Sequence, residues 1–394
     1  VPAIVTGPTS VGRAHAQRLS EVNLTRRGQM TTRPGEKRRA TIRVLPVRVV
    51  QVSATFRPTT SKGTQAMKRG FGIVLVGLGA FLLVLAGLLR FYVVPQLAKA
   101  PLVPGESTGG ISTTTNEGVA EKLFDPGALA SGGDPNRTNV KLLATRTTRG
   151  DVLASEGNTT ECPAKPNDYA IYDSFQNVTD ESGQTVTAST IRVSFDRVSS
   201  ELNNNCGANV DGETVDMTGV NPLKFPMFTQ QQTYNYFDST LNKAIPIEFS
   251  GTQDLDGLQV YVFKQSIPGT QFSEQEVPGS LVDSPDASYK AARFYSNERE
   301  LLVEPNTGSI IGGTEQQRQW LTGPDGTEKV VIIEATISTT EKTKQEAIDD
   351  AKSSISLLNM LKTTVPIIGG ILGIIALIIG FWLISRRDDS APSA

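Results

Sequence analysis

The chain has little of the chemistry that most enzyme sites need. Among its 394 residues there are one histidine, His15, and two cysteines, Cys162 and Cys206. Beyond residue 15, therefore, a serine or cysteine nucleophile has no histidine base and zinc has no histidine ligand. Two thiols are too few for a four-cysteine zinc site or an iron–sulfur cluster. We predict a protein that is not an enzyme, with no catalytic residue, cofactor or metal.

Short phosphate and metal motifs are missing as well. The sequence has no Gly-x-x-x-x-Gly-Lys-Ser/Thr loop,. The polar loop Asn203–Asp216 contains Asn209-Val-Asp211-Gly212, which resembles part of a calcium-binding loop. Gly207 and Thr218, however, occupy the first and last ligand positions, where carboxylates are needed,. We expect a solvated loop there.

Acidic side chains are scarce in residues 1–66, which hold twelve basic residues and two acids. We predict a basic leader that is disordered or not part of the mature protein, because Met67 followed by Lys68 and Arg69 is a suitable start for a membrane anchor,. Residues 91–362, by contrast, contain 21 basic and 36 acidic side chains. Such an acidic surface argues against nucleic acid as a partner.

Two uncharged runs, Gly70–Leu89 and Thr363–Ser385, are long enough to cross a bilayer,. Lys68 and Arg69 precede the first run and Arg386 and Arg387 follow the second, and basic flanks are typical of cytoplasmic ends,. We predict an integral protein of the cytoplasmic (inner) membrane with two spans, both termini cytoplasmic and the main domain extracytoplasmic. The alternative for the first run is a cleaved signal peptide.

Close approach of these two spans is a further expectation. Gly369-x-x-x-Gly373 lies in the second run, and small residues at this spacing let transmembrane helices pack closely,.

The region between the spans has mostly the period of β-strands. Ile191–Val198 alternates apolar and polar residues, whereas Leu258–Gln265 is apolar on both faces and is therefore expected to be covered on both sides,. From Thr343 to Lys362 the apolar residues follow a helical period, as in a helix that docks on the sheet or binds a partner,. The predicted fold is mainly β, an antiparallel curved sheet or sandwich with a C-terminal helix, flanked by two transmembrane α-helices.

The predicted organisation has seven parts. They are a basic leader over 1–66, an N-terminal transmembrane anchor over 67–94, a Gly/Pro/Ser/Thr-rich stalk or first strands over 95–138, a β-rich extracytoplasmic domain over 139–342, an amphipathic helix over 343–362, a C-terminal transmembrane helix over 363–385 and a cytoplasmic tail over 386–394.

Two groups of side chains in the β-rich domain are candidates for a special role. Cys162 and Cys206 are predicted to form a disulfide, which the predicted compartment permits,. The second group is aromatic: Tyr234, Tyr236, Phe237, Tyr261 and Phe263. Such residues pack a core or line an apolar cavity for a lipid chain, and both alternatives stay open.

The order of these features resembles an actinobacterial family. The likeness rests on Met67-Lys-Arg before an anchor, on Phe225-Pro226, Thr233-Tyr-Asn-Tyr-Phe-Asp238 and Asp256-Gly-Leu-x-Val-Tyr-x-Phe-x-Gln265, and on Val303-Glu-Pro-x-Thr-Gly308. The chain is similar to the PorA family, formerly a domain of unknown function, over about residues 67–387. The resemblance implies a cell-envelope protein of mycolic-acid-bearing bacteria, related to mycobacterial proteins of envelope-lipid or lipoglycan handling and polar growth.

Three functions follow as hypotheses, in order of preference. The first is an extracytoplasmic β domain that binds or passes an envelope lipid or lipoglycan intermediate. The second is a non-catalytic scaffold that recruits envelope-biosynthesis or lipid-transport membrane proteins. The third is a pore-forming subunit, with an enzyme ranked after it; two helices cannot enclose a pore alone, and the strands lack a lipid-facing apolar band.

Overall fold

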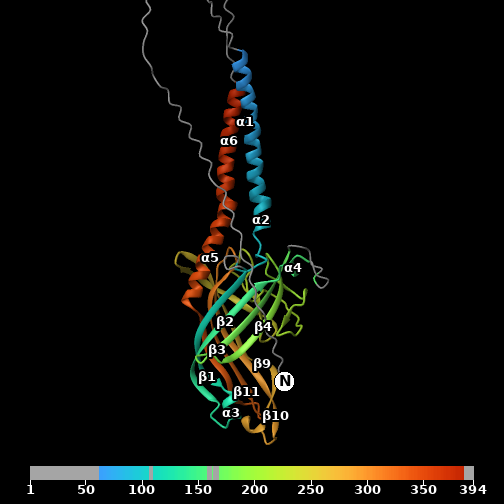
Figure 1. The fold of residues 1–394 in the computed structure, drawn as a ribbon, viewed down its shortest axis with the longest axis vertical. Coiled ribbons are helices and arrows are strands. Elements are labelled where there is room, and N and C mark those ends of the chain that lie inside the picture. The colour runs from blue at the N-terminus through green and yellow to red at the C-terminus, as the bar shows by residue number, and fades with distance from the viewer. Residues whose placement is uncertain (1–61, 106–109, 158–161, 163–167, 386–394) are drawn as a thin grey trace, which may run out of the picture. The chain divides into compact units, whose positions relative to one another are not determined.

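The computed structural model describes residues 62–105, 110–157, 162 and 168–385 (Figure 1). The leader predicted over 1–66, apart from its last five residues, and the tail with Arg386 and Arg387 lie outside the described residues. The N-terminal elements are α1 (Lys62–Leu88), η1 (Leu89–Val93) and α2 (Val94–Leu97); the elements that follow up to residue 210 are β1 (Ile111–Phe124), α3 (Pro126–Ala130), β2 (Asn136–Gly150), α4 (Val152–Ser155), β3 (Tyr169–Asp180), β4 (Thr185–Asp196), β5 (Leu202–Asn203) and β6 (Asn209–Val210).

The second half continues with long strands and ends in helices. Its elements are β7 (Tyr234–Asp238), β8 (Lys243–Leu255), β9 (Leu258–Pro278), η3 (Gly279–Leu281), β10 (Ser288–Val303), β11 (Ile310–Thr322), β12 (Glu328–Thr339), α5 (Glu341–Asn359), η4 (Met360–Thr364) and α6 (Val365–Ser385).

In the described part of the chain, twelve strands form one antiparallel sheet. Their order is β5-β4-β3-β2-β1-β12-β11-β10-β9-β8-β7, with β6 beside β4. The sheet curls into a half-barrel, so the predicted mainly β, antiparallel fold with a C-terminal helix and two apolar helices is confirmed (Figure 1). β1 and β12, the first and last strands of the sequence, are neighbours, which places the chain connections to both apolar helices beside one another.

The two edges of the curled sheet are joined at one point. The backbone of Val220 donates to Asn235 on β7 over 2.6 Å and accepts from Phe237 over 3.1 Å. The preceding residue, Gly219, accepts from Leu202 on β5 over 2.8 Å. This short segment therefore satisfies backbone groups on both edges, which would otherwise be open to pairing with other strands.

Glycines bring α1 and α6 together, and both helices are long and apolar enough to cross a membrane. A methyl group added to Gly79 would lie 2.6 Å from the carbonyl oxygen of Gly373, and one added to Gly380 would lie 2.8 Å from that of Gly72. Of the predicted Gly369-x-x-x-Gly373 pair, Gly373 makes the close contact, whereas Gly369 has nothing nearer than 4.0 Å. The contact repeats at seven residues, as expected of two helices that wrap around each other.

The amphipathic helix α5 packs on the outside of the sheet. Ile348 and Ala351 are buried against Leu258, Val260 and Ile311. This contact is the docking on the sheet that the sequence predicts, and it covers one face of β9. The other face of β9 carries Phe263, which lies in the aromatic core, so this strand is covered on both sides as expected.

At the boundary between sheet and apolar helices, both helices change geometry. η1 and η4 are π-helical, and the Arg90 guanidinium in η1 donates to the carbonyl oxygen of Lys362 in η4 over 2.8 Å. π-Helical turns widen a helix locally and free a backbone carbonyl. The irregularity of the second helix thus precedes Pro366, at the point where α5 passes into α6.

Candidate functional site

One face of the sheet, the inner face, carries a stripe of polar residues. Residues directly opposite in an antiparallel pair share a face, and the pairs can be followed from β3 to β9. The inner face so defined includes Gln176, Arg146, Thr114, Asn116, Glu315, Arg299 and Gln265.

This face is the concave one. Arg299 of β10 contacts Asp238 of β7, and the charge of Arg146 on β2 acts on Glu315 of β11 and on Tyr236 of β7. These interactions join strands that are not neighbours in the sheet, so they act across its concave side. The inner face therefore carries a polar patch among buried apolar side chains such as Phe263, Leu301 and Ile333.

Arg299 is the centre of a buried network, the Arg299 cluster, made of Asp238, Gln265, Arg299 and Glu315. Its guanidinium lies 3.1 Å from an Asp238 oxygen, 3.0 Å from a Glu315 oxygen and 2.6 Å from the Gln265 side-chain oxygen. It also stacks over the Tyr236 ring, 5.3 Å from the ring centre. Such a fork of charged hydrogen bonds fixes all four side chains in one geometry.

The members of the Arg299 cluster differ in their access to solvent. The side chains of Asp238 and Arg299 are 1% and 9% exposed, whereas that of Glu315 is 39% exposed. Glu315 lies on the inner face of a strand with neighbours on both sides, so the solvent that reaches it must enter the hollow of the curled sheet. The inner face is thus open to water at this position.

Charge compensation controls the ionisation of the cluster. Burial disfavours the charged form of Glu315, but the charge and hydrogen bonds of Arg299, with Arg146 and Asn297, hold its pKa below the ordinary value,. Burial also opposes the charge of Arg299, but Glu315 and Asp238 raise its pKa well above the ordinary value. The charged forms of Glu315 and Arg299 are therefore both favoured by their mutual contact,.

The five aromatic candidates do not lie in one place. Tyr236 and Phe263 are buried in a core around Phe225, whose ring centre is 5.7 Å and 4.9 Å from theirs. Tyr234 and Tyr261 pack at the margin of the same core.

Phe237 points to the other side of β7. There it is fully buried with Tyr172 and Phe195 in a second core. In both cores the rings are in contact with one another, as expected of core packing. The alternative, a lipid cavity at these residues, stays a prediction.

The segments that carried the family resemblance meet in space. Phe225 donates its backbone N–H to Gly308 over 2.8 Å, and Thr229 donates to Pro305 over 2.7 Å. The buried Lys224 amine donates to the Thr307 carbonyl, and burial lowers its pKa to about 8. Gly308 has a φ of +71°, and a methyl group there would lie 2.2 Å from the Phe225 oxygen. These residues therefore form a backbone clamp, and only glycine fits at its corner.

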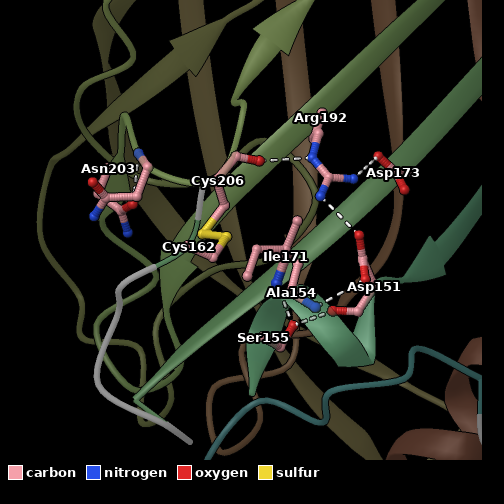
Figure 2. Close-up of a disulfide and its surroundings, with 10 residues drawn as sticks. Asp151, Ala154, Ser155, Cys162, Ile171, Asp173, Arg192, Asn203 and Cys206 are labelled. Atoms are coloured by element: carbon pink, nitrogen blue, oxygen red, sulfur yellow. Dashed lines mark hydrogen bonds and ion pairs between the residues drawn. A yellow bond between two sulfur atoms is a disulfide. The ribbon is translucent and has the colours of Figure 1, made fainter. Parts of the chain in front are cut away.

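Cys162 and Cys206 form the predicted disulfide, with their Cα atoms 4.6 Å apart (Figure 2). The bridge is anchored to the outer face of the sheet by Arg192, which donates to the Cys206 carbonyl over 2.9 Å. The same guanidinium bonds Asp151 and Asp173 over 2.8 Å and 2.7 Å. The disulfide thus has a structural environment, remote from the inner face.

Sequence reasoning missed the Arg299 cluster. Asp238 and Glu315 are 77 residues apart in the chain, and which strands face each other is fixed only by the curl of the sheet. One signal was present: Arg299 is a charged residue at an inward position of β10, and the inward neighbours on that strand, Asn297 and Leu301, are both buried. Charges at such positions occur mainly where they are paired or functional.

Comparison with known proteins finds a family and relatives that carry the name Porin PorA. A sequence model of the family described as Porin PorA matches residues 71–382. Porin PorA of Corynebacterium resistens is 26% identical over 417 residues, covering 82% of this chain and 98% of that protein. Porin PorA of Corynebacterium amycolatum is 26% identical over 395 residues, covering 81% and 100%.

These matches overturn the location predicted from the basic flanks. Porins of this family are cell-wall channels of the mycolic-acid outer layer, so the prediction of a cytoplasmic-membrane protein with cytoplasmic termini is wrong. The distribution of Lys and Arg orients helices that stay in the cytoplasmic membrane, and it carries no information on export to another layer. Because the family match runs from the first apolar helix through the sheet to the second, the chain belongs to the PorA family.

Proposed function

We propose that the protein is a non-enzymatic subunit of a cell-wall channel and that polar solutes pass along the inner face of its curled sheet. The observation that carries the proposal is the Arg299 cluster, a set of fixed charges inside the curl that water reaches at Glu315. Charged side chains inside a β structure are how aqueous pores select among solutes.

The apolar helices offer no such surface. The exposed side chains of α1 and α6 are large and apolar, among them Phe81, Leu88, Ile371 and Ile378. Residues of this kind suit a lipid environment, and two helices cannot enclose a pore. We assign α1 and α6 the role of anchor, and passage through the layer itself then needs several copies of the chain.

Binding of an envelope lipid stays a proposal second to conduction. The aromatic residues that motivated it pack into two separate cores. The acidic scaffold function has no structural feature in its favour beyond the charge of the sequence.

Conductance through the purified full-length chain in a planar lipid bilayer tests the proposal. Glu315→Gln removes one negative charge from the inner face and leaves Arg146 and Arg299, so the channel should become more selective for anions, read as a shift of the reversal potential in a salt gradient. Glu328→Gln is the matched control, because Glu328 also pairs with an arginine, Arg318, but on the outer face.

The two outcomes are distinct. Selectivity that shifts in Glu315→Gln and not in Glu328→Gln supports conduction along the inner face. A wild-type chain that enters the bilayer without conductance, or two variants with the same selectivity, would reject it.

A further inference from the structure

A second arginine on the inner face has no acidic partner in the part of the chain that the structure describes. Arg293 lies on β10 six residues before Arg299, on the same side of the strand, directly opposite Leu321. Its guanidinium donates to the side-chain oxygen of Gln319 over 2.6 Å and stacks on the Phe272 ring, 5.2 Å from the ring centre. Among the described residues no carboxylate lies within ion-pair distance of it, and its buried Nε–H group has no hydrogen-bond acceptor.

This environment is unfavourable for the Arg293 cation when no counter-charge is bound. Burial lowers the pKa of Arg293, and no neighbouring charge raises it. Apolar side chains lie near it on the inner face: Leu321, directly opposite on β11, is buried, and Ile333, opposite Gln319, is buried as well. A guanidinium does not lose its proton in proteins, so the charge stays in place and a counter-ion would stabilise it.

Arg146 repeats the arrangement elsewhere on the inner face. Two nitrogens of its guanidinium donate to the side-chain oxygen of Gln176, over 3.0 Å and 2.5 Å, and in the described structure no carboxylate lies within 4.0 Å of it. A hydroxyl pair, Thr148 and Ser174, lies two residues further along the same two strands. By contrast, Arg192 and Arg318 on the outer face each bind two carboxylates.

We propose that Arg293 is the ligand of an oxyanion, a carboxylate or phosphate group that enters the hollow of the sheet. An oxyanion would accept from the orphaned Nε–H and supply the counter-charge that Gln319 cannot. The apolar surroundings strengthen this attraction because they exclude competing water. Gln319 and Phe272 then act as positioning residues that hold the guanidinium flat between amide and ring. The proposal rests on the geometry of Arg293 and does not depend on conduction.

Thermal unfolding of the full-length chain in detergent tests the site, with sodium phosphate as the probe and sodium chloride added to keep the ionic strength constant. Phosphate at ten times its Kd should raise the Tm of the wild-type chain by about 2 °C. Arg293→Met should show no phosphate-dependent rise, and Arg293→Lys, which keeps the charge but loses the fork, a smaller one. Arg149→Gln, which removes an exposed arginine of the outer face, should respond as the wild type does.

A second titration with dihexanoyl phosphatidic acid distinguishes a lipid headgroup from a free anion. A midpoint at least a hundred times lower than that of phosphate identifies a lipid headgroup, and equal midpoints identify a small anion; in both cases the rise must be lost in Arg293→Met. Equal rises in wild type and Arg293→Met, or no rise in the wild type with either probe, would overturn the proposal.

Discussion

Arg299 and Arg293 lie six residues apart on one strand and on one face, but their partners differ. Arg299 is held by two carboxylates and an amide, whereas Arg293 is held by one amide and a ring. The first network is nearly complete within the protein, because each charge has an opposite charge in contact. The second leaves a positive charge and a buried donor unsatisfied.

The comparison separates two uses of a buried charge. A complete network holds β7 against the neighbouring strands β10 and β11 in one arrangement, in addition to the aromatic core that also joins them,. An incomplete network leaves a hydrogen-bond donor for a ligand. Until a ligand binds, the unpaired buried group lowers the stability of the fold. The inner face of this sheet therefore contains a structural site and a binding site in the same strand.

Removing Arg299 should have the largest effect on stability. Arg299→Met leaves Asp238 buried and Glu315 partly buried without their counter-charge, so the free energy of unfolding should fall by about 3–5 kcal/mol. Arg318→Met removes an arginine that also binds two carboxylates but is 29% exposed, and it should cost below about 1 kcal/mol,. Denaturant unfolding followed by far-ultraviolet circular dichroism measures both. Equal losses in the two variants would mean that the cluster does not stabilise the curl.

Glu315 should make stability depend on acid, with an intermediate effect. Its pKa is lower in the folded chain than its ordinary value of 4.5, so its ionised form stabilises the fold above pH 4.5, and this contribution is lost as the pH falls further,. Glu315→Gln should cost about 1–2 kcal/mol at pH 7, where an amide replaces a charged acceptor. It should also lose less stability than the wild type between pH 5 and pH 3.

Unfolding at a series of pH values checks this effect. Glu328→Gln, which changes a carboxylate of the outer face, serves as the control and should follow the acid dependence of the wild type. A Glu315→Gln variant as acid-sensitive as the wild type would show that Glu315 is not held ionised by Arg299.

The sequence predicts the elements of this fold better than their assembly. Local period identifies β4, β9 and α5 and the two apolar helices, because burial on one face leaves a regular mark on neighbouring residues. It also places Ile348 and Ala351 on the face of α5 that is buried. The curl of the sheet depends on the combined twist and register of eleven strand pairings and their bulges. The sequence of any one segment therefore does not determine it.

The inner face was out of reach for the same reason. In the sequence, Asp238 stands out only as the last residue of the aromatic segment Thr233–Asp238 that carries the family resemblance. No residue near it in the chain indicates that Arg299 is its partner. The aromatic residues of that segment suggested one cavity, but alternation sends Tyr236 and Phe237 into different cores,. The predicted location was wrong for a different reason. Basic flanks indicate how a helix is oriented in the cytoplasmic membrane, but not to which layer of the envelope the protein is exported.

The smallest expected effect comes from completing the second network. Gln319→Glu replaces the amide oxygen 2.6 Å from the Arg293 guanidinium with a carboxylate, which converts the site to the kind found at Arg299. Stability should rise by about 0.5–1 kcal/mol, because the new ion pair is partly buried and satisfies a charge already present. The phosphate-dependent rise in Tm should disappear at the same time, since the counter-ion is now part of the chain. A variant that is more stable yet still responds to phosphate would show that the anion binds elsewhere, and one that is less stable would show that Arg293 already has its counter-charge.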